Sequence, residues 1–112
     1  MSFKSAVGEV VTFQVKFTLR EGSVDRLFSV SLTCNRRKPE EIDEQPSDQT
    51  VKDFLLDNTI DWSGNRLVLD PVTSEPVVTF SKAAFDYMLK HPGVMADTWA
   101  AYLLHTASKT KN

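Results

Sequence analysis

Cysteine, histidine and glycine are scarce in this sequence: its 112 residues include one cysteine, two histidines and four glycines. The single thiol, Cys34, excludes an internal disulfide, and only His91 and His105 could join it in a cysteine–histidine nucleophile pair. A G-x-S-x-G elbow and a phosphate-binding glycine loop are both absent. Hydrolases and nucleotide-binding enzymes therefore lose their usual sequence support, and we expect no catalytic site, no cofactor and no metal.

Long apolar runs and a net charge of one sign are absent as well. No segment approaches the roughly 18 apolar residues that cross a bilayer, and residues 1–13 lack the apolar core of a signal peptide. The 13 basic and 15 acidic residues give a net charge of −2. Such a balance provides no electrostatic attraction for nucleic acid. We expect a cytoplasmic protein without a membrane or nucleic-acid partner.

The most charged segment, residues 36–44, is mixed in sign. Its basic residues are followed by Pro39 and then by acids. Proline suits the first turn of a helix and acids complement the dipole at a helix N-terminus, so we expect a solvated helical turn. The alternative is a phosphate-binding role for Arg36, Arg37 and Lys38, which the neighbouring acids weaken because they cancel the field.

The N-terminal part of the chain alternates between apolar and polar residues, as half-buried strands do. One alternating segment runs from Val11 to Arg20 and a second from Phe28 to Cys34, with a glycine-containing loop between them. This pattern predicts an antiparallel hairpin. Cys34 falls on its apolar face, which favours a buried, inert thiol over a reactive one. Residues 67–69 or 76–80 are the candidates for a third strand.

Two short helices are predicted in the middle of the chain. Thr50 and Asp53 fit a capping box at the start of the first, and Asn58 fits a left-handed stop at its end. Ser81 is the expected N-cap of the second. The inner face of this second helix is apolar: Ala84, Phe85, Met88 and Leu89.

Residues 62–65, Trp-Ser-Gly-Asn, predict a turn between these helices in which Gly64 lets the chain reverse beside the indole. We expect Trp62 to be a buried core residue rather than a stacking platform for a ligand. Asp57 and Asp61 could suggest a carboxylate pair or a calcium loop, but their spacing does not fit the calcium pattern. A solvated Asp57 and a local turn hydrogen bond from Asp61 are the favoured interpretation.

A longer helix is predicted from Val94 to about Ser108, after a break at His91-Pro92-Gly93. Its apolar surface is broad because two neighbouring stripes follow helical spacing. The first stripe is Met95, Trp99, Tyr102 and Leu103. The second stripe is Ala96, Ala100, Leu104 and Ala107. We expect one stripe to pack on the hairpin and the other to bind a partner, and we take the first, with its aromatic anchors, as the candidate partner-binding site.

Together these elements predict an α+β fold, with an N-terminal antiparallel hairpin, extended by the third strand if it forms, packed against three or four C-terminal helices. The length predicts a single domain, 1–112, in which residues 1–35 form the hairpin and residues 36–112 are mainly helical with the tryptophan turn. Two strands alone are only marginally stable in water. The helices or another chain must therefore cover the apolar face of the hairpin.

The order of these features resembles a known family, the small tail assembly chaperones encoded by long-tailed bacteriophages. The shared features are a short helix, a W-x-G turn, a segment that ends in Phe-Ser, and a helix that ends in Met-Leu. The matching residues are Trp62, Gly64, Pro76, Phe80, Ser81, Ala84, Phe85, Met88 and Leu89. The resemblance covers about two thirds of the chain, and its order and spacing matter more than its individual letters.

The resemblance implies a non-enzymatic protein of the bacterial cytoplasm that binds the tape measure protein before and during tail assembly. It would shield apolar helices of that client until tail-tube subunits displace it. The implied partners are the tape measure protein, the tail-tube protein, a longer frameshifted form of this chain, and further copies in a homo-oligomer. The alternative is a structural tail subunit or another small protein-interaction subunit without catalytic activity. An enzyme would instead need a deep polar pocket around His91 or His105.

Overall fold

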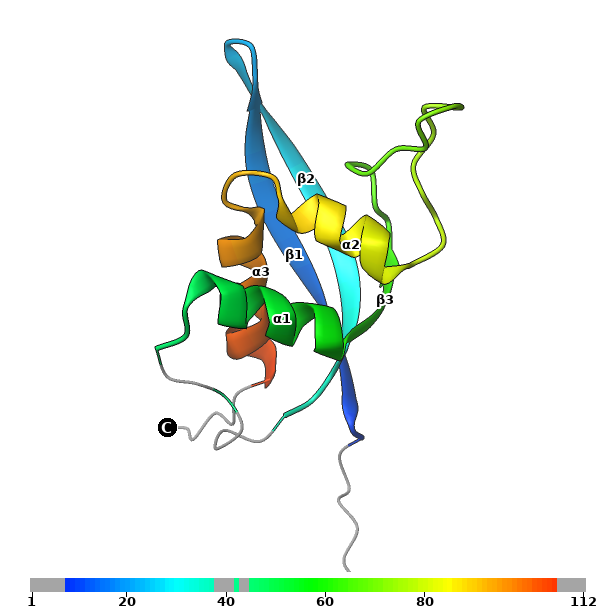
Figure 1. Ribbon diagram of the computed structural model, residues 1–112. Helices are drawn as coiled ribbons and strands as arrows, with labels where there is room; N and C mark the ends of the chain where they lie inside the picture. The colour runs from blue at the N-terminus through cyan, green and yellow to red at the C-terminus, as the bar shows by residue number, and fades with distance from the viewer. Residues whose placement is uncertain (1–7, 38–41, 43–44, 107–112) are drawn as a thin grey trace, which may run out of the picture.

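Three strands and three helices make up the part of the chain that the computed structural model describes, residues 8–37, 42 and 45–106. Their order is β1 (Val10–Glu21), β2 (Val24–Asn35), α1 (Asp48–Asn58), β3 (Thr59–Ser63), α2 (Lys82–Leu89) and α3 (Val94–Thr106). The strands form one antiparallel sheet in the order β1-β2-β3, and the helices pack on its apolar face (Figure 1). The predicted α+β fold is confirmed.

The hairpin is longer than the sequence predicts. Its register is continuous from Val10 opposite Asn35 to Glu21 opposite Val24, so only Gly22 and Ser23 connect the strands. Gly22 has a φ of 66°, which suits a glycine-led two-residue turn. The residues between the two alternating segments, other than Gly22 and Ser23, therefore pair in the ladder. The closed end of the hairpin extends past the helices in Figure 1.

The third strand lies elsewhere than expected. It is Thr59–Ser63, and it pairs antiparallel with β2 so that Trp62 lies opposite Leu32. Of the two predicted segments, residues 67–69 and 76–80, only Leu69 and Pro76 pair, and they pair with each other in an isolated bridge. The expected left-handed stop at Asn58 is wrong, because the chain passes from α1 straight into β3. The residue after it, Thr59, is extended with a φ of −89° and leads the chain directly into the sheet.

The first helix also begins earlier than predicted. Ser47, not Thr50, is the N-cap, and its hydroxyl accepts a hydrogen bond from the backbone N–H of Thr50 at 3.2 Å. Asp53 therefore does not act in a capping box. Its carboxylate accepts from the Gln49 side chain at 2.8 Å. Serine and threonine both suit an N-cap. A start at Ser47 places Asp48 in the first turn, where its negative charge complements the helix dipole.

The second helix agrees with the sequence. Ser81 caps it and accepts from the backbone N–H of Ala84 at 3.1 Å, while Phe85, Met88 and Leu89 are buried. The third helix begins at Val94 as predicted. Its expected end near Ser108, the stripe residue Ala107 and the helical turn expected after Pro39 lie outside the described residues.

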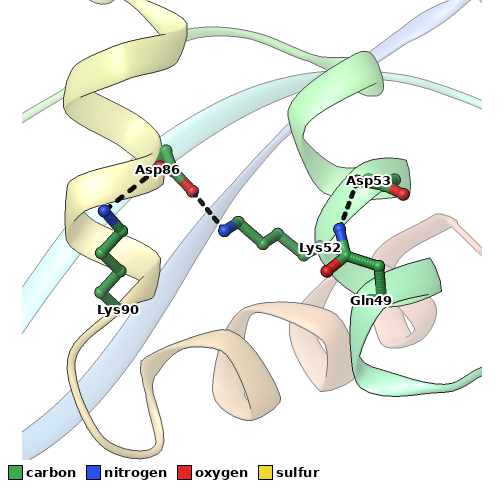
Figure 2. A network of polar contacts seen from close by, with 5 residues as sticks. All are labelled: Gln49, Lys52, Asp53, Asp86 and Lys90. Atoms are coloured by element: carbon green, nitrogen blue, oxygen red, sulfur yellow. Dashed lines mark hydrogen bonds and ion pairs between the residues drawn. The ribbon is translucent and has the colours of Figure 1, made fainter.

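A set of ion pairs joins α1 to α2 (Figure 2). Lys52 of α1 places Nζ 3.0 Å from Oδ1 of Asp86 on α2, and Nζ of Lys90, the C-cap residue of α2, lies 3.7 Å from Oδ2. The hydrogen bond with Lys52 is the main reason that the pKa of Asp86 lies below its ordinary value. The Lys82 amine also donates to the carbonyl of Leu56. These contacts link the two short helices, and the Lys52–Asp86 pair between them is half-buried.

The core is one continuous cluster between the sheet and the helices. The sheet contributes alternate residues from its apolar face, and each helix adds large side chains from its inner face. The residues exposed by 2% or less include Val15, Val30, Leu32, Cys34, Leu55, Phe85, Met88, Val94 and Tyr102. The opposite face of the hairpin is polar, with Thr12 and Thr33 sharing a hydrogen bond of 2.9 Å.

Candidate protein-binding site

Tyr102, one of the four predicted partner-binding residues, is wholly buried. Its ring contacts Phe13 of β1, Phe54 of α1 and Trp99, and its hydroxyl donates to the carbonyl of Asn35 at 2.9 Å. Burial raises the pKa of this phenol. The predicted role of Tyr102 as an accessible anchor is therefore wrong, because the space between the hairpin and α1 needs a large ring to fill it.

The other members of that stripe, Met95, Trp99 and Leu103, are half-buried and pack against the core. The Trp99 ring meets Phe54 edge to face, with 5.3 Å between centroids. The exposed side of α3 is instead the second stripe, in which Leu104 is 56% exposed beside Ala96 and Ala100. Partner binding by Met95, Trp99 and Leu103 stays a prediction, but most of their surface is used within the fold.

The tryptophan motif, Trp62 to Gly64 together with Phe80 and Ser81, spans the end of β3 and the residues that lead into α2. Trp62 is 4% exposed, and its indole N–H donates to the carbonyl of Val78 at 3.0 Å. Phe80 stands edge to face against Trp62 at 5.6 Å and also contacts Phe85 at 5.8 Å. Gly64 has a φ of 76° where the chain turns away from the sheet. The prediction that Trp62 is a core residue is confirmed.

Residues 64–79, most of the connection between β3 and α2, carry exposed apolar side chains that the sequence does not single out. Val72 is 89% exposed, Val78 83% and Leu69 46%. The loop stands away from the helices in Figure 1. Scattered exposed apolar residues are normal, but several on one short segment indicate a contact surface.

The base of the loop is held by Asn65, which is 7% exposed. Its amide nitrogen donates to the carbonyls of Val68 and Val77, at 2.9 and 3.0 Å. Its carbonyl oxygen accepts from the backbone N–H groups of Leu67 and Val68, at 3.0 and 2.9 Å. One side chain thus joins the outgoing and returning segments of the loop, and a buried amide with all these partners satisfied is a strong constraint on the backbone.

The tip of the loop is held by Asp70. Its Oδ1 accepts from the N–H groups of Val72 and Thr73 at 2.8 and 2.9 Å, and its carbonyl accepts from Ser74 at 2.9 Å. The Thr73 bond, followed by the Val72 bond, holds the pKa of Asp70 below its ordinary value. Ser74 has a φ of 61° at this turn. The loop therefore presents Val72 on an ordered backbone, which lowers the entropy that binding would cost.

A pocket of about 300 Å³ lies at the foot of the loop. Trp62 of β3 lines it, together with Asn65 and Arg66 of the outgoing segment of the loop and Pro76 and Val78 of the returning segment. The lining is mainly apolar with one cationic group. A pocket of this kind suits a large apolar side chain of a partner, which hot-spot anchors usually are.

Residues discounted for chemistry are separated in space. Asp61 accepts from the backbone N–H of Trp62 at 2.9 Å, the local hydrogen bond expected of it, and Asp57 is exposed. The His105 ring stacks on Phe13 with 5.5 Å between centroids, while His91 contacts Tyr87. Within residues 8–37, 42 and 45–106, no three histidine, cysteine or acidic side chains gather as metal ligands would.

Cys34 is fully buried, and its sulfur lies 3.3 Å from the Thr59 hydroxyl oxygen. Burial raises the pKa of the thiol from 9.0 to about 11, although the Thr59 hydrogen bond lowers it in part. Because the thiolate is the reactive form, we expect Cys34 of the native protein to react with disulfide reagents far more slowly than in the urea-unfolded chain.

The same shift predicts how stability depends on pH. Between 9.0 and about 11 the unfolded thiol ionises while the folded thiol stays neutral, so the free energy of unfolding should fall as the pH rises through this range. Urea denaturation of the wild-type protein and of Cys34→Ala checks this, since the variant lacks the titrating group. A difference between the two that stays constant across the range would contradict the expectation.

Comparisons with protein-family models, curated proteins and solved structures found no match to this chain. Among the residues that the structure describes, no helix has the length and apolar character needed to cross a membrane.

Proposed function

We propose that this chain is a non-catalytic protein-binding subunit, and specifically a phage tail assembly chaperone that binds and shields the tape measure protein. The observation that supports protein binding is the ordered 64–79 loop, which keeps Val72 and Val78 in solvent. Two largely exposed valines on a constrained backbone add nothing to the core. The choice of client rests on the resemblance of the tryptophan motif to the tail assembly chaperones.

The proposed mechanism is the covering of apolar client surface. Val72 and Val78 would contact the apolar stripe of a client helix, and a large client side chain would enter the pocket beside Trp62 and Pro76. Many copies along a long client would prevent its exposed stripes from aggregating. Tail-tube subunits would displace the chaperone if they bind the same client surface with higher affinity.

Co-expression with the tape measure protein of the same genome tests this proposal. The wild-type chain should raise the soluble fraction of the client. Replacing both loop valines, Val72→Lys with Val78→Lys, should weaken capture by about thirtyfold or more, the usual consequence of losing a binding hot spot. Both side chains are exposed, so the variant should keep the wild-type circular dichroism spectrum and urea midpoint.

Val24→Lys provides the matched control, because Val24 is 61% exposed but lies at the end of the hairpin. This variant should capture the client as the wild type does. Equal capture by the loop variant would move the client site away from residues 64–79. The alternative function, a structural tail subunit, would be favoured by either of two results. One is that the wild-type chain fails to solubilise the client, and the other is that this chain is a stoichiometric component of purified particles.

A further inference from the structure

The outer edge of β1 has no hydrogen-bonding partner among the described residues, because β1 is the first strand of the sheet. The N–H of Arg36 donates to the carbonyl of Glu9 at 2.7 Å, which identifies Glu9 and Arg36 as a hydrogen-bonded pair of the hairpin. Such pairs alternate along an antiparallel ladder. The odd-numbered residues of β1 therefore bond to β2, and even-numbered residues such as Gln14, Lys16 and Thr18 direct their backbone groups outward.

This edge has few of the features that usually prevent strand pairing. Exposed edges are commonly protected by proline, by a bulge or by several charges. The register of β1 has no irregularity from Val10 to Glu21, the strand contains no proline, and Lys16 is its only charge before Arg20. An uninterrupted edge of this kind is suited to pair with another extended segment.

We propose that the partner is a second copy of this chain, with the two β1 strands antiparallel about a twofold axis at Val15. In this register Gln14 of each copy lies opposite Lys16 of the other, and Phe13 lies opposite Phe17, so polar and apolar faces match. Every even-numbered residue from Val10 to Arg20 then forms a hydrogen-bonded pair. The result is a continuous six-stranded sheet, three strands from each copy.

Neighbouring registers are less favourable. A shift by one residue opposes apolar and polar side chains and turns the outward backbone groups out of alignment. An axis at Lys16 places two lysines directly opposite each other, which is destabilising. An axis at Gln14 places Leu19 opposite Glu9 and Arg20 opposite Gly8, so an apolar side chain meets a charged one and the pairing runs past the end of β1 at Val10.

Helix α3 lies on the face of the sheet that the two copies would share. The helix packs on β1, and Trp99 faces α1 through its contact with Phe54. Since successive residues of a helix are separated by about 100°, Leu104 lies about 140° around the axis from Trp99 and about 160° from the buried Tyr102, so its side chain points away from α1 and from the sheet. Twofold pairing places both α3 helices on the same face of the joined sheet.

Sedimentation equilibrium of the full chain tests the proposal through a charge exchange at one pair. Gln14→Lys places a lysine opposite Lys16 of the other copy at each of the two symmetry-related pairs, and it should raise the dimer dissociation constant about fivefold. Gln14→Glu places an acid opposite Lys16 and should lower the constant by a similar factor. The double variant, Gln14→Lys with Lys16→Gln, restores the original pairing with its sides exchanged and should return the constant to near the wild-type value. Both positions are exposed in the single chain, so all variants should stay folded.

Amide hydrogen exchange provides the second readout. In the dimer, the amides of Gln14, Lys16 and Thr18 should exchange slowly, and dilution should release them while the odd-numbered amides stay protected. A monomeric wild-type chain, fast exchange at these amides in a dimer, or equal effects of Gln14→Lys and Gln14→Glu would each overturn the proposal. None of these outcomes depends on whether the chain captures a tape measure protein.

Discussion

Trp62→Ala is expected to lower the free energy of unfolding by about 3 to 5 kcal/mol, the usual cost of removing a large aromatic side chain from a core. The indole is 4% exposed, contacts Phe80, and lies opposite Leu32 in the sheet. Its N–H also donates to Val78, so truncation leaves that loop carbonyl without its partner. The substitution should therefore weaken the core and free the returning segment of the 64–79 loop together.

Far-UV circular dichroism in urea measures this effect without relying on tryptophan emission. Trp62→Phe is the control, because it keeps an aromatic ring against Phe80 but removes the indole N–H. It should cost less than Trp62→Ala, and its cost reports the lost hydrogen bond together with the smaller ring. An unchanged urea midpoint for Trp62→Ala would mean that the indole is exposed in solution and is available to a ligand.

Tyr102→Ala should cost a similar amount, about 3 to 5 kcal/mol. Its side chain is fully buried and joins β1, α1 and α3 through Phe13, Phe54 and Trp99. Its hydroxyl is also bonded to the end of β2, at Asn35. The cavity left by alanine would lie where the sheet and two helices meet, so the surrounding elements have little freedom to close it.

Tyr102→Phe separates the ring from the hydroxyl. It should cost only about 1 kcal/mol, the typical contribution of one hydrogen bond. Tyr102→Lys should instead leave the chain unfolded, since it buries a charge without a partner. A folded Tyr102→Lys protein, judged by circular dichroism and by a cooperative urea transition, would show that the ring is accessible and would restore it to the partner-binding surface.

The sequence predicts the elements whose evidence is local. The hairpin follows from alternation on both sides of one glycine, and α2 follows from a serine cap before a short apolar face. Each of these signals lies within a few residues of the structure that it predicts. The burial of Trp62 could be predicted too, because a large aromatic residue beside a turn glycine seldom stays in water.

The elements that the sequence missed depend on distant partners. The five residues of β3 are too few for a clear alternation, and their pairing partner, β2, precedes α1 in the chain. The proline and valine residues of the 64–79 loop follow no regular period, so no local pattern predicts an ordered backbone there. That order depends on Asn65 reaching both Val68 and Val77, which only the folded path of the loop brings to the same side chain.

The two stripes of α3 show a different limit. Both follow helical spacing, and the aromatic stripe was the more attractive choice for a partner because aromatic residues dominate binding hot spots. Aromatic rings also fill cores, and here the Tyr102 ring packs in the core against Phe13 and Phe54. Composition alone does not decide between these uses, because the decision depends on the depth of the space beneath the helix.

The packing of α3 on β1 has a consequence for the order of events during synthesis. Strand β1 leaves the ribosome before α3, the helix that packs on it, and Tyr102 bonds to Asn35 across a separation of 67 residues. The hairpin can form early, but its apolar face over Phe13 stays uncovered until the C-terminal helix has emerged. Nascent chains therefore expose this face until α3 has been synthesised, and a premature stop before α3 would release a hairpin prone to aggregate.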